Sequence, residues 1–151
     1  MTRNVEVRID PPGDDAQLRE AWAVKERIRR SDGVLEQTRA YFETEYRRQT
    51  AYLLLSPNGR EAVVAFGVIR EDGYLTLFGV APDHRRQGLG TRLVEALTDD
   101  YDTITLHTRA TNREAIEFYE HTGFTVRRRI GDYYRDGTDA LELGFERDGS
   151  K

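Results

Sequence analysis

Hydrophobic and polar positions along the chain follow two periods, one of two residues and one of about 3.6 residues. The shorter period predicts strands and the longer one predicts helices. Turn-forming groups separate the earlier elements, at Pro11-Pro12-Gly13, Ser31-Asp32-Gly33, Pro57-Asn58-Gly59 and Glu71-Asp72-Gly73. The predicted strands are residues 4–9, 52–56, 62–69, 74–80, 103–108, 124–129 and 140–146, and the predicted helices are residues 15–30, 34–45, 90–100 and 112–122.

This order of elements predicts a mixed α/β fold with about seven strands in one central sheet and about four helices. The three strands and two turns of residues 52–80 predict an antiparallel meander. Because a helix joins strands 74–80 and 103–108, a right-handed crossover should place these two strands side by side and parallel. We expect one domain over residues 1–147 and a loose tail over 148–151. Trp22, Tyr41 and Phe42 are expected in the core.

One loop in this pattern has the character of an anion site. Strand 74–80 ends at Pro82-Asp83, and the loop continues as Arg85-x-x-Gly88-x-Gly90 into a helix with apolar residues at helical spacing. The first turn of a helix carries backbone N–H groups without intrahelical partners, and glycines let a phosphate approach the backbone closely. Arg85 and Arg86 add positive charge, although the motif differs from the two common nucleotide-binding glycine patterns.

Composition excludes several classes of function. The chain has 151 residues, 38% of them hydrophobic and 33% charged, and it contains no cysteine, so a thiol nucleophile and a disulfide are both excluded. The three histidines, at 84, 107 and 121, show no metal-ligand spacing. A net charge of −4 argues against nucleic-acid binding. Neither a membrane span nor a signal peptide is apparent, and we expect a cytoplasmic protein.

A second motif lies downstream, with Asn112, Tyr119 and Gly123-Phe124 in the run Asn-Arg-Glu-Ala-Ile-Glu-Phe-Tyr-Glu-His-Thr-Gly-Phe. Together with the glycine loop it resembles the GCN5-related N-acetyltransferase superfamily over roughly residues 50–145. The resemblance implies a GNAT fold and acetyl-CoA as the cofactor.

The resemblance also assigns roles to residues of this chain. Backbone N–H groups from Gln87 to Thr91 would bind the pyrophosphate of CoA, and the main chain of residues 78–80 would pair with the pantetheine arm. Asn112 would contact CoA, and Tyr119 would donate a proton to its sulfur. For Asn112 a simple helix cap is an alternative, and for Tyr119 aromatic packing is one. The implied cofactor residues are Phe78, Gly79, Val80, Arg85, Arg86, Gln87, Gly88, Leu89, Gly90, Thr91, Asn112 and Tyr119.

His107 is the most informative single residue. In strand 103–108, Ile104 and Leu106 should face one side while Thr105 and His107 face the other. An imidazole titrates near neutrality and suits a general base, directly or through water. His107 and Tyr74 match a His and Tyr pair in a protein N-terminal acetyltransferase of the superfamily, so both are candidate catalytic bases. The alternative is a hydrogen-bonded core histidine.

The segment Asp132-Tyr133-Tyr134-Arg135-Asp136-Gly137-Thr138-Asp139-Ala140 narrows the substrate. It resembles the ribosomal-protein and protein N-terminal (N-alpha) acetyltransferase branch, in which such tyrosines line a groove for the acceptor peptide. Tyr133 and Tyr134 are thus candidate substrate-binding residues. A hairpin with surface tyrosines is the alternative. The sequence at 30–45 lacks that branch's clear acceptor pocket, which leaves the accepted N-terminal residue open.

Three hypotheses follow. The first is an acetyl-CoA-dependent N-acetyltransferase that acts on the α-amine of a protein or peptide by direct attack in a ternary complex, with Tyr119 as the acid. The second keeps the fold and cofactor but takes a small-molecule amine, such as a polyamine, an amino acid or an aminoglycoside. The third is a non-catalytic acyl-CoA-binding module. We expect no nucleic-acid, membrane or metal partner, and a monomer or a homodimer.

Overall fold

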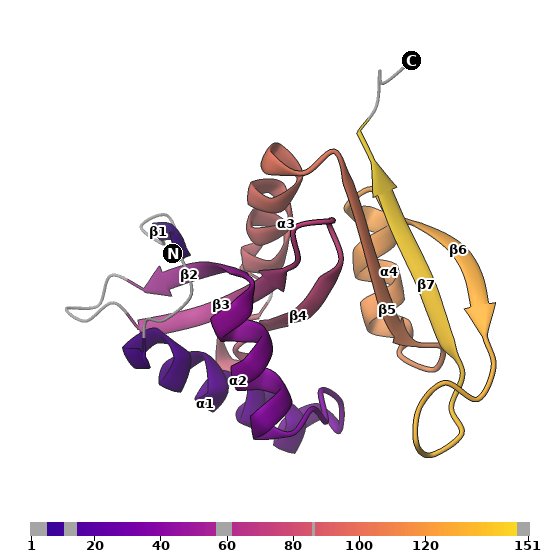
Figure 1. The fold of residues 1–151 in the computed structure, drawn as a ribbon, viewed down its shortest axis with the longest axis horizontal. Coiled ribbons are helices and arrows are strands. Elements are labelled where there is room, and N and C mark those ends of the chain that lie inside the picture. The colour runs from indigo at the N-terminus through magenta and orange to yellow at the C-terminus, as the bar shows by residue number, and fades with distance from the viewer. Residues whose placement is uncertain (1–5, 11–14, 57–61, 86, 148–151) are drawn as a thin grey trace. The chain divides into compact units, whose positions relative to one another are not determined.

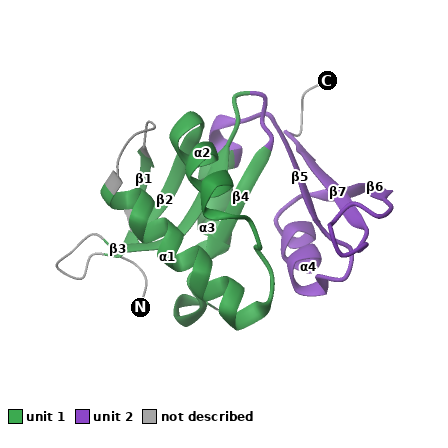
Figure 2. Ribbon diagram, turned by 60° about the horizontal axis from the view of Figure 1, so that its bottom comes forward, with its two compact units in different colours: residues 1–71, 75–97 green, residues 72–74, 98–151 purple. Residues whose placement is uncertain are grey.

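The computed structural model describes residues 6–10, 15–56, 62–85 and 87–147. These residues form four α-helices, one short 3-10 helix and seven strands, in the order β1, α1, α2, β2, β3, β4, η1, α3, β5, α4, β6, β7 (Figure 1). The mixed α/β class is confirmed. The chain divides into two compact units, residues 1–71 with 75–97 and residues 72–74 with 98–151 (Figure 2). The predicted single domain over 1–147 stays a prediction, and the predicted tail at 148–151 lies outside the described residues.

The first unit holds a four-stranded antiparallel sheet in the order β1-β2-β3-β4. The predicted meander is therefore confirmed. The turn predicted at 57–59 and the strand end predicted at 11–13 lie outside the described residues. The strands are β1 (Glu6–Asp10), β2 (Thr50–Ser56), β3 (Ala62–Ile69) and β4 (Leu75–Val80).

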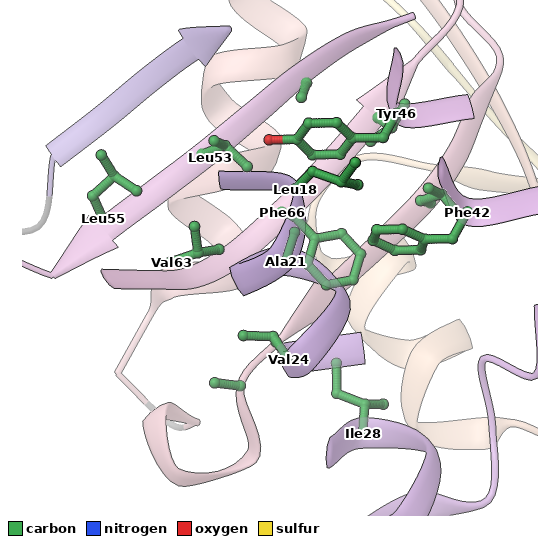
Figure 3. Packing of buried hydrophobic residues seen from close by; sticks show 14 residues of the cluster. Leu18, Ala21, Val24, Ile28, Phe42, Tyr46, Leu53, Leu55, Val63 and Phe66 are labelled. Atoms are coloured by element: carbon green, nitrogen blue, oxygen red, sulfur yellow. The ribbon is translucent and has the colours of Figure 1, made fainter. Parts of the chain in front are cut away.

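Helices cover both faces of this sheet. Helices α1 (Asp15–Asp32) and α2 (Arg39–Arg48) pack apolar side chains against alternate residues of β2 and β3, and Figure 3 shows this core around Phe42 and Phe66. The rings of Phe42 and Phe66 meet edge to face with centroids 5.6 Å apart. On the opposite face, the position of a Cβ on Gly67 lies 3.6 Å from both Leu93 and Leu97 of α3 (Leu89–Asp100). Continuous burial along β3 follows from this double cover.

Two of the three aromatic residues expected in the core are found there. Phe42 is fully buried, and Trp22 packs against it with ring centroids 5.4 Å apart. Tyr41 was predicted wrongly, because its side chain is 40% exposed. It lies in the first turn of α2, three residues after the N-cap Thr38, and is not among the buried residues of that helix.

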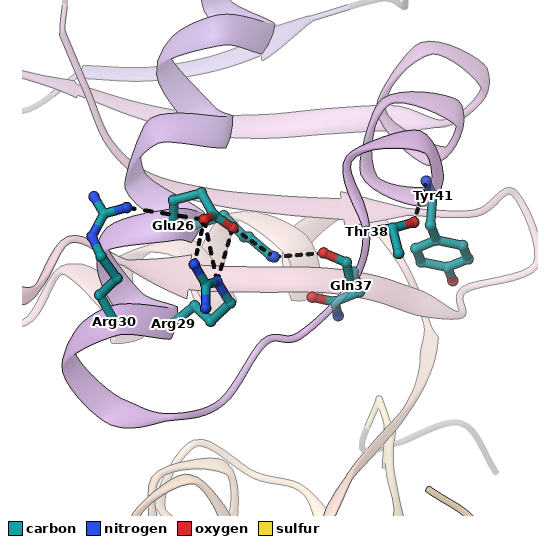
Figure 4. A network of polar contacts seen from close by, with 7 residues as sticks. Glu26, Arg29, Arg30, Gln37, Thr38 and Tyr41 are labelled. Atoms are coloured by element: carbon teal, nitrogen blue, oxygen red, sulfur yellow. Dashed lines mark hydrogen bonds and ion pairs between the residues drawn. The ribbon is translucent and has the colours of Figure 1, made fainter. Parts of the chain in front are cut away.

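The start of the second helix was also predicted wrongly. Residues 34–38 are not helical; Leu35 has a φ of 58°, and α2 begins only after Thr38, whose hydroxyl accepts a hydrogen bond from the amide of Tyr41 at 3.2 Å. A side chain of α1 holds the segment that connects α1 to α2. The buried ammonium of Lys25 donates to the carbonyl of Gln37 at 2.5 Å and pairs with Glu26 at 3.0 Å (Figure 4). Hydrogen bonds from Arg29 and Lys25 lower the pKa of Glu26 to about 2. A side-chain cap and a buried cation therefore override the apolar period at residues 34–38.

The second unit holds a three-stranded antiparallel sheet in the order β5-β7-β6. Its buried side chains come from β5, α4, β7 and the residue before β6, and they are Ile104, Leu106, Tyr119, Leu143 and Phe124. The elements are β5 (Thr103–Arg109), α4 (Arg113–His121), β6 (Thr125–Ile130) and β7 (Ala140–Glu146).

The seven strands form two sheets and not the one central sheet that was predicted. Among the described residues the parallel contact is a single bridge between Tyr74 and Thr105, supported by a hydrogen bond of 3.0 Å from the amide of Thr105 to the carbonyl of Gly73. A register shift opposite the start of β4, between Val68 and Ile69, marks an irregularity of the kind that bends a strand. Parallel pairing over the rest of strands 74–80 and 103–108 would join the two units, and it stays a prediction.

Gly79 offers a test of the packing in the first unit. A Cβ at this position would lie 2.6 Å from Cδ1 of Ile28, which is closer than a real Cβ approaches, and a tight 3.0 Å from Cζ of Phe66. We expect Gly79→Ala to lower the free energy of unfolding by about 1–3 kcal/mol, measured by urea denaturation. Gly67→Ala is the matched control on the neighbouring strand, since its Cβ would make only ordinary contacts at 3.5–3.6 Å. Equal stability of the two variants would contradict this account.

Candidate functional site

The glycine loop has the predicted order of strand, loop and helix. After β4 the chain makes the 3-10 turn η1 (Pro82–His84), passes Gly88 at a φ of 75°, and enters α3 at Leu89. The amide of Arg92 donates to the carbonyl of Gly88 at 3.0 Å, so the amides of Leu89, Gly90 and Thr91 precede the first bond of the helix. A Cβ on Gly88 would meet no atom of the described residues within 4 Å, so these residues leave the backbone there open to a ligand.

Two ion pairs tie this loop to the end of α1. Arg85 pairs with Asp32 at 2.8 Å, and Arg27 pairs with Asp83 at 2.6 Å. Burial acts to raise the pKa of Asp83, but a hydrogen bond from its own backbone and the charge of Arg27 outweigh it, so the pKa lies below its ordinary value. Arg85 is thus held at the loop by a carboxylate, while Arg86 lies outside the described residues.

Phe78, Gly79 and Val80 lie on β4, which is the edge strand of its four-stranded sheet. Their partners on β3 are Gly67, Phe66 and Ala65. Gly79 is buried against Phe66 and Ile28, whereas the side chains on either side of it are partly exposed. An edge strand is the position at which a ligand can pair as an added strand.

Asn112 and Tyr119 lie at the two ends of α4. The side-chain oxygen of Asn112 accepts a hydrogen bond from the amide of Ala115 at 3.2 Å, so the helix-cap interpretation is confirmed. Tyr119 is buried between the rings of Phe118 and Phe124, at centroid distances of 5.2 and 5.4 Å. Burial raises the pKa of its phenol well above the ordinary value. Tyr119 therefore keeps its proton over the whole physiological range.

His107 lies on the less buried face of β5 and has a polar partner on each of its two ring nitrogens. Its Nδ1 is joined to the hydroxyl of Tyr74 by a hydrogen bond of 2.5 Å, and its Nε2 lies 3.3 Å from Oε1 of Glu142. The predicted alternation is confirmed, since Ile104 and Leu106 are buried on the other face. His107 has partners on both nitrogens, yet 17% of its side chain is exposed, so it is not fully enclosed in a core.

Tyr133 and Tyr134, in the connection between β6 and β7, have different neighbours: Tyr133 lies beside His107, and Tyr134 lies beside Arg109. The ring of Tyr133 lies beside His107 with centroids 5.1 Å apart, and 46% of its surface is exposed. Tyr134 packs under the guanidinium of Arg109 at 4.3 Å, and burial, followed by the charge of Tyr133, raises its pKa. Arg109 in turn pairs with Asp136 at 3.0 Å. The structure therefore brings together Tyr74, His107 and Tyr133 from three separate segments.

Sequence reasoning missed Glu142 and Arg128. Glu142 interrupts the apolar run of β7, and this was the available signal. Burial acts to raise its pKa, but the hydrogen bond and charge of Arg128 and the hydrogen bond of His107 lower it further than burial raises it. Arg128 donates to Oε1 of Glu142 at 3.1 Å. The ionised carboxylate of Glu142 thus lies on the Nε2 side of His107, the candidate base.

The described part of the chain contains no helix that is long and apolar enough to cross a membrane. It also contains no group of three or more histidine, aspartate or glutamate side chains placed to hold a metal ion.

Comparison with known proteins gives a consistent set of matches. Residues 16–124 match the model of the acetyltransferase (GNAT) family. The human N-alpha-acetyltransferase 30 is 38% identical over 76 residues, which cover 47% of this chain and 21% of that protein. The [ribosomal protein bS18]-alanine N-acetyltransferase of Escherichia coli K12 is 39% identical over 97 residues, 58% of this chain and 63% of that protein. This chain thus spans less than two thirds of the curated relatives it matches. A crystal structure of the ribosomal-protein-S18-alanine N-acetyltransferase from Escherichia coli superimposes with a TM-score of 0.75 and 25% identity, covering 97% of each chain.

Proposed function

The chain belongs to the acetyltransferase (GNAT) family, and on that premise we propose that it transfers the acetyl group of acetyl-CoA to the N-terminal α-amine of a protein or peptide. The named relatives support this acceptor, since they are N-alpha-acetyltransferases and an acetyltransferase of a ribosomal-protein alanine. The single observation in this chain that carries the proposal is the contact of Tyr74, His107 and Tyr133, which puts a basic group beside an aromatic side chain that can cover a peptide.

The glycine loop fits the anionic part of acetyl-CoA. Its donors are backbone amides of the first turn of α3, its glycine leaves the approach open, and Arg85 lies beside it. Backbone N–H groups at a helix N-terminus bind phosphate through both hydrogen bonds and the helix dipole. We assign pyrophosphate binding to residues 87–91, a strand-like contact to residues 78–80, and a further CoA contact to Asn112.

The acetyl thioester supplies the acyl group, and the residues of this chain move the protons. The amine nitrogen forms a bond to the carbonyl carbon as the bond from that carbon to sulfur breaks. An acceptor that binds as an ammonium loses two protons in all, and the first must leave before its nitrogen can attack. One leaves through the Tyr74–His107 pair, and the other replaces the proton that Tyr119 gives to the departing sulfur. No residue of the chain is acylated in this scheme.

An α-amine suits a mild base of this kind. Its ordinary pKa is about 7.7–8.0, against about 10.4 for a lysine side chain, so neutralising the lysine at pH 7 costs about 3.4 kcal/mol more. An imidazole paired with a phenol can remove the proton of the α-ammonium at a pH near neutrality. Tyr133, and Tyr134 beside it, would bond the acceptor backbone.

The test measures thiol release from acetyl-CoA with short peptides varied at the first two residues, next to the same peptides with blocked N-termini and a panel of free amines. We expect turnover only on peptides with a free N-terminus, and mass spectrometry should place the acetyl group on the first residue. Turnover confined to polyamines, amino acids or aminoglycosides would instead assign a small-molecule acceptor. Binding of acetyl-CoA without any transfer would identify a non-catalytic module.

A further inference from the structure

Three side chains form one row across the three-stranded sheet of the second unit. Glu142 of β7 pairs in register with His107 of β5 on one side and with Arg128 of β6 on the other. Their polar atoms connect in the same order, from Nε2 of His107 to Oε1 of Glu142 at 3.3 Å, and from that oxygen to Nε of Arg128 at 3.1 Å. Tyr74 extends the row from the opposite side of β5. The sheet thus aligns a phenol, an imidazole, a carboxylate and a guanidinium.

The carboxylate selects one form of the imidazole. An ionised glutamate only accepts hydrogen bonds, so Nε2 of His107 must carry the proton that faces it. In the neutral imidazole Nδ1 is then the acceptor, and the hydroxyl of Tyr74 is the donor of the bond at 2.5 Å. A hydroxyl oxygen has two acceptor lone pairs, so the oxygen of Tyr74 is the group of this row that can take a proton from an amine.

Several other titratable or charged groups face this row. Tyr133 lies against the His107 ring from the β6–β7 connection, and Arg109 shares the face of β5 but is paired with Asp136. Arg128 is 65% exposed and reaches His107 only through Glu142, whereas Glu142 and His107 are 20% and 17% exposed. Of these charges, Glu142 lies at hydrogen-bond distance from the imidazole and therefore acts on it most strongly.

We propose that Glu142 is a positioning residue for the transfer, which fixes His107 with its proton on Nε2 and strengthens it as the base behind Tyr74, while Arg128 limits this effect. The role rests on the proposed function. The acceptor amine gives a proton to the oxygen of Tyr74 as the hydroxyl proton of Tyr74 passes to Nδ1 of His107. The resulting imidazolium lies against the Glu142 carboxylate and later returns its extra proton to solvent. Tyr74 is thus the catalytic group that touches the amine, and His107 stores the proton.

Glu142→Gln tests the row by pH dependence. The amide keeps the shape but loses the negative charge that favours the imidazolium, so the acidic limb of the kcat/KM profile should move to lower pH by about one unit. The plateau above the limb should fall about tenfold, because the weakened base is also less well oriented. A merely structural role would lower the plateau and leave the limb in place, and that outcome would overturn the proposal.

Arg128→Gln should move the same limb in the opposite direction. Without the guanidinium of Arg128, the negative charge of Glu142 is less compensated and stabilises the imidazolium of His107 more strongly. The acidic limb should therefore move to higher pH. The shift should be small, about 0.3 pH units, because Arg128 is largely exposed and its charge is screened. The matched control is Arg129→Gln on the next residue of β6, which loses a comparable pair with Asp139 and should leave the limb unchanged. Shifts of the same sign in the two test variants would contradict the proposed order of the row.

A spectroscopic measurement separates this inference from the proposed function. The chain has only three histidines, so nitrogen-15 NMR of the imidazoles, assigned with a His107→Gln variant, can follow His107 in the enzyme without substrates. We expect a protonated Nε2 and an unprotonated Nδ1 in the neutral form. If no amine is acetylated but these signals hold, the proposed function fails and the row stands. A proton on Nδ1 in the neutral form would overturn the inference, even in an enzyme that acetylates peptides.

Discussion

His107→Ala should lower kcat/KM for the peptide acceptor by about 10²- to 10⁴-fold, the usual contribution of general acid–base catalysis. The physical reason is the geometry of the pair, since Nδ1 of His107 lies 2.5 Å from the hydroxyl oxygen of Tyr74 and would receive its proton in the proposed mechanism. Tyr74→Phe should show a loss of similar size, because it removes the hydroxyl that contacts the amine in the proposed mechanism. Steady-state kinetics with acetyl-CoA and an unblocked peptide measure both losses.

The double variant of His107 and Tyr74 sharpens this test. Residues that act as one unit give non-additive losses, so the double variant should be about as slow as either single one. His121→Ala is the control, since His121 is an exposed histidine at the end of α4. If His107→Ala and Tyr74→Phe keep the wild-type kcat at every pH, the pair is not the base.

Tyr119→Phe should reduce kcat by about 10²-fold or more while leaving the fold intact. The substitution removes one oxygen and keeps the ring, which packs between Phe118 and Phe124. Burial raises the pKa of the Tyr119 phenol, so the group is present as an acid throughout the assay range and adds no alkaline limb near neutral pH. Without it the thiolate of CoA must leave unprotonated or take its proton from water.

The matched control is Tyr46→Phe, which deletes the hydroxyl of another buried tyrosine, in the core of the first unit. We expect this variant to keep its kcat, with any change confined to stability. A Tyr119→Phe enzyme that turns over at the wild-type rate would assign Tyr119 to packing alone, which was the alternative open from the sequence.

Helix caps, turn residues and the period of apolar positions made many helices and strands predictable from the sequence. Asn112 was expected to cap a helix that ends near Thr122, and the structure has α4 from Arg113 to His121 with that cap. The strand at 62–69 and the strand at 140–146 have the predicted bounds. These features depend on neighbours within a few residues, where capping, turn chemistry and apolar period agree. The likeness to the GCN5-related superfamily, drawn from the two motifs, is confirmed by the family match.

Features that depend on distant partners were missed. Residues 34–38 have an apolar helical period, but the hydrogen bond from Lys25 to Gln37 and the turn at Leu35 stop a helix there. Glu142 could be placed on a strand but not opposite His107, because register across β5, β7 and β6 is set by long-range pairing. The face of His107 was predictable from alternation within its own strand, whereas its partners were not. The roles assigned to the cofactor residues stay predictions.

The position of Trp22 makes the first unit optically distinct. It is the only tryptophan in the chain, and it lies at the α1–α2 contact, 5.4 Å from the ring of Phe42 and under the ammonium of Lys25 at 4.6 Å. Its fluorescence therefore reports on the packing of the first unit alone, while the imidazole of His107 reports on the second. The protein thus contains one intrinsic probe for each unit, and a comparison of their unfolding curves shows whether the two units lose structure together or in turn.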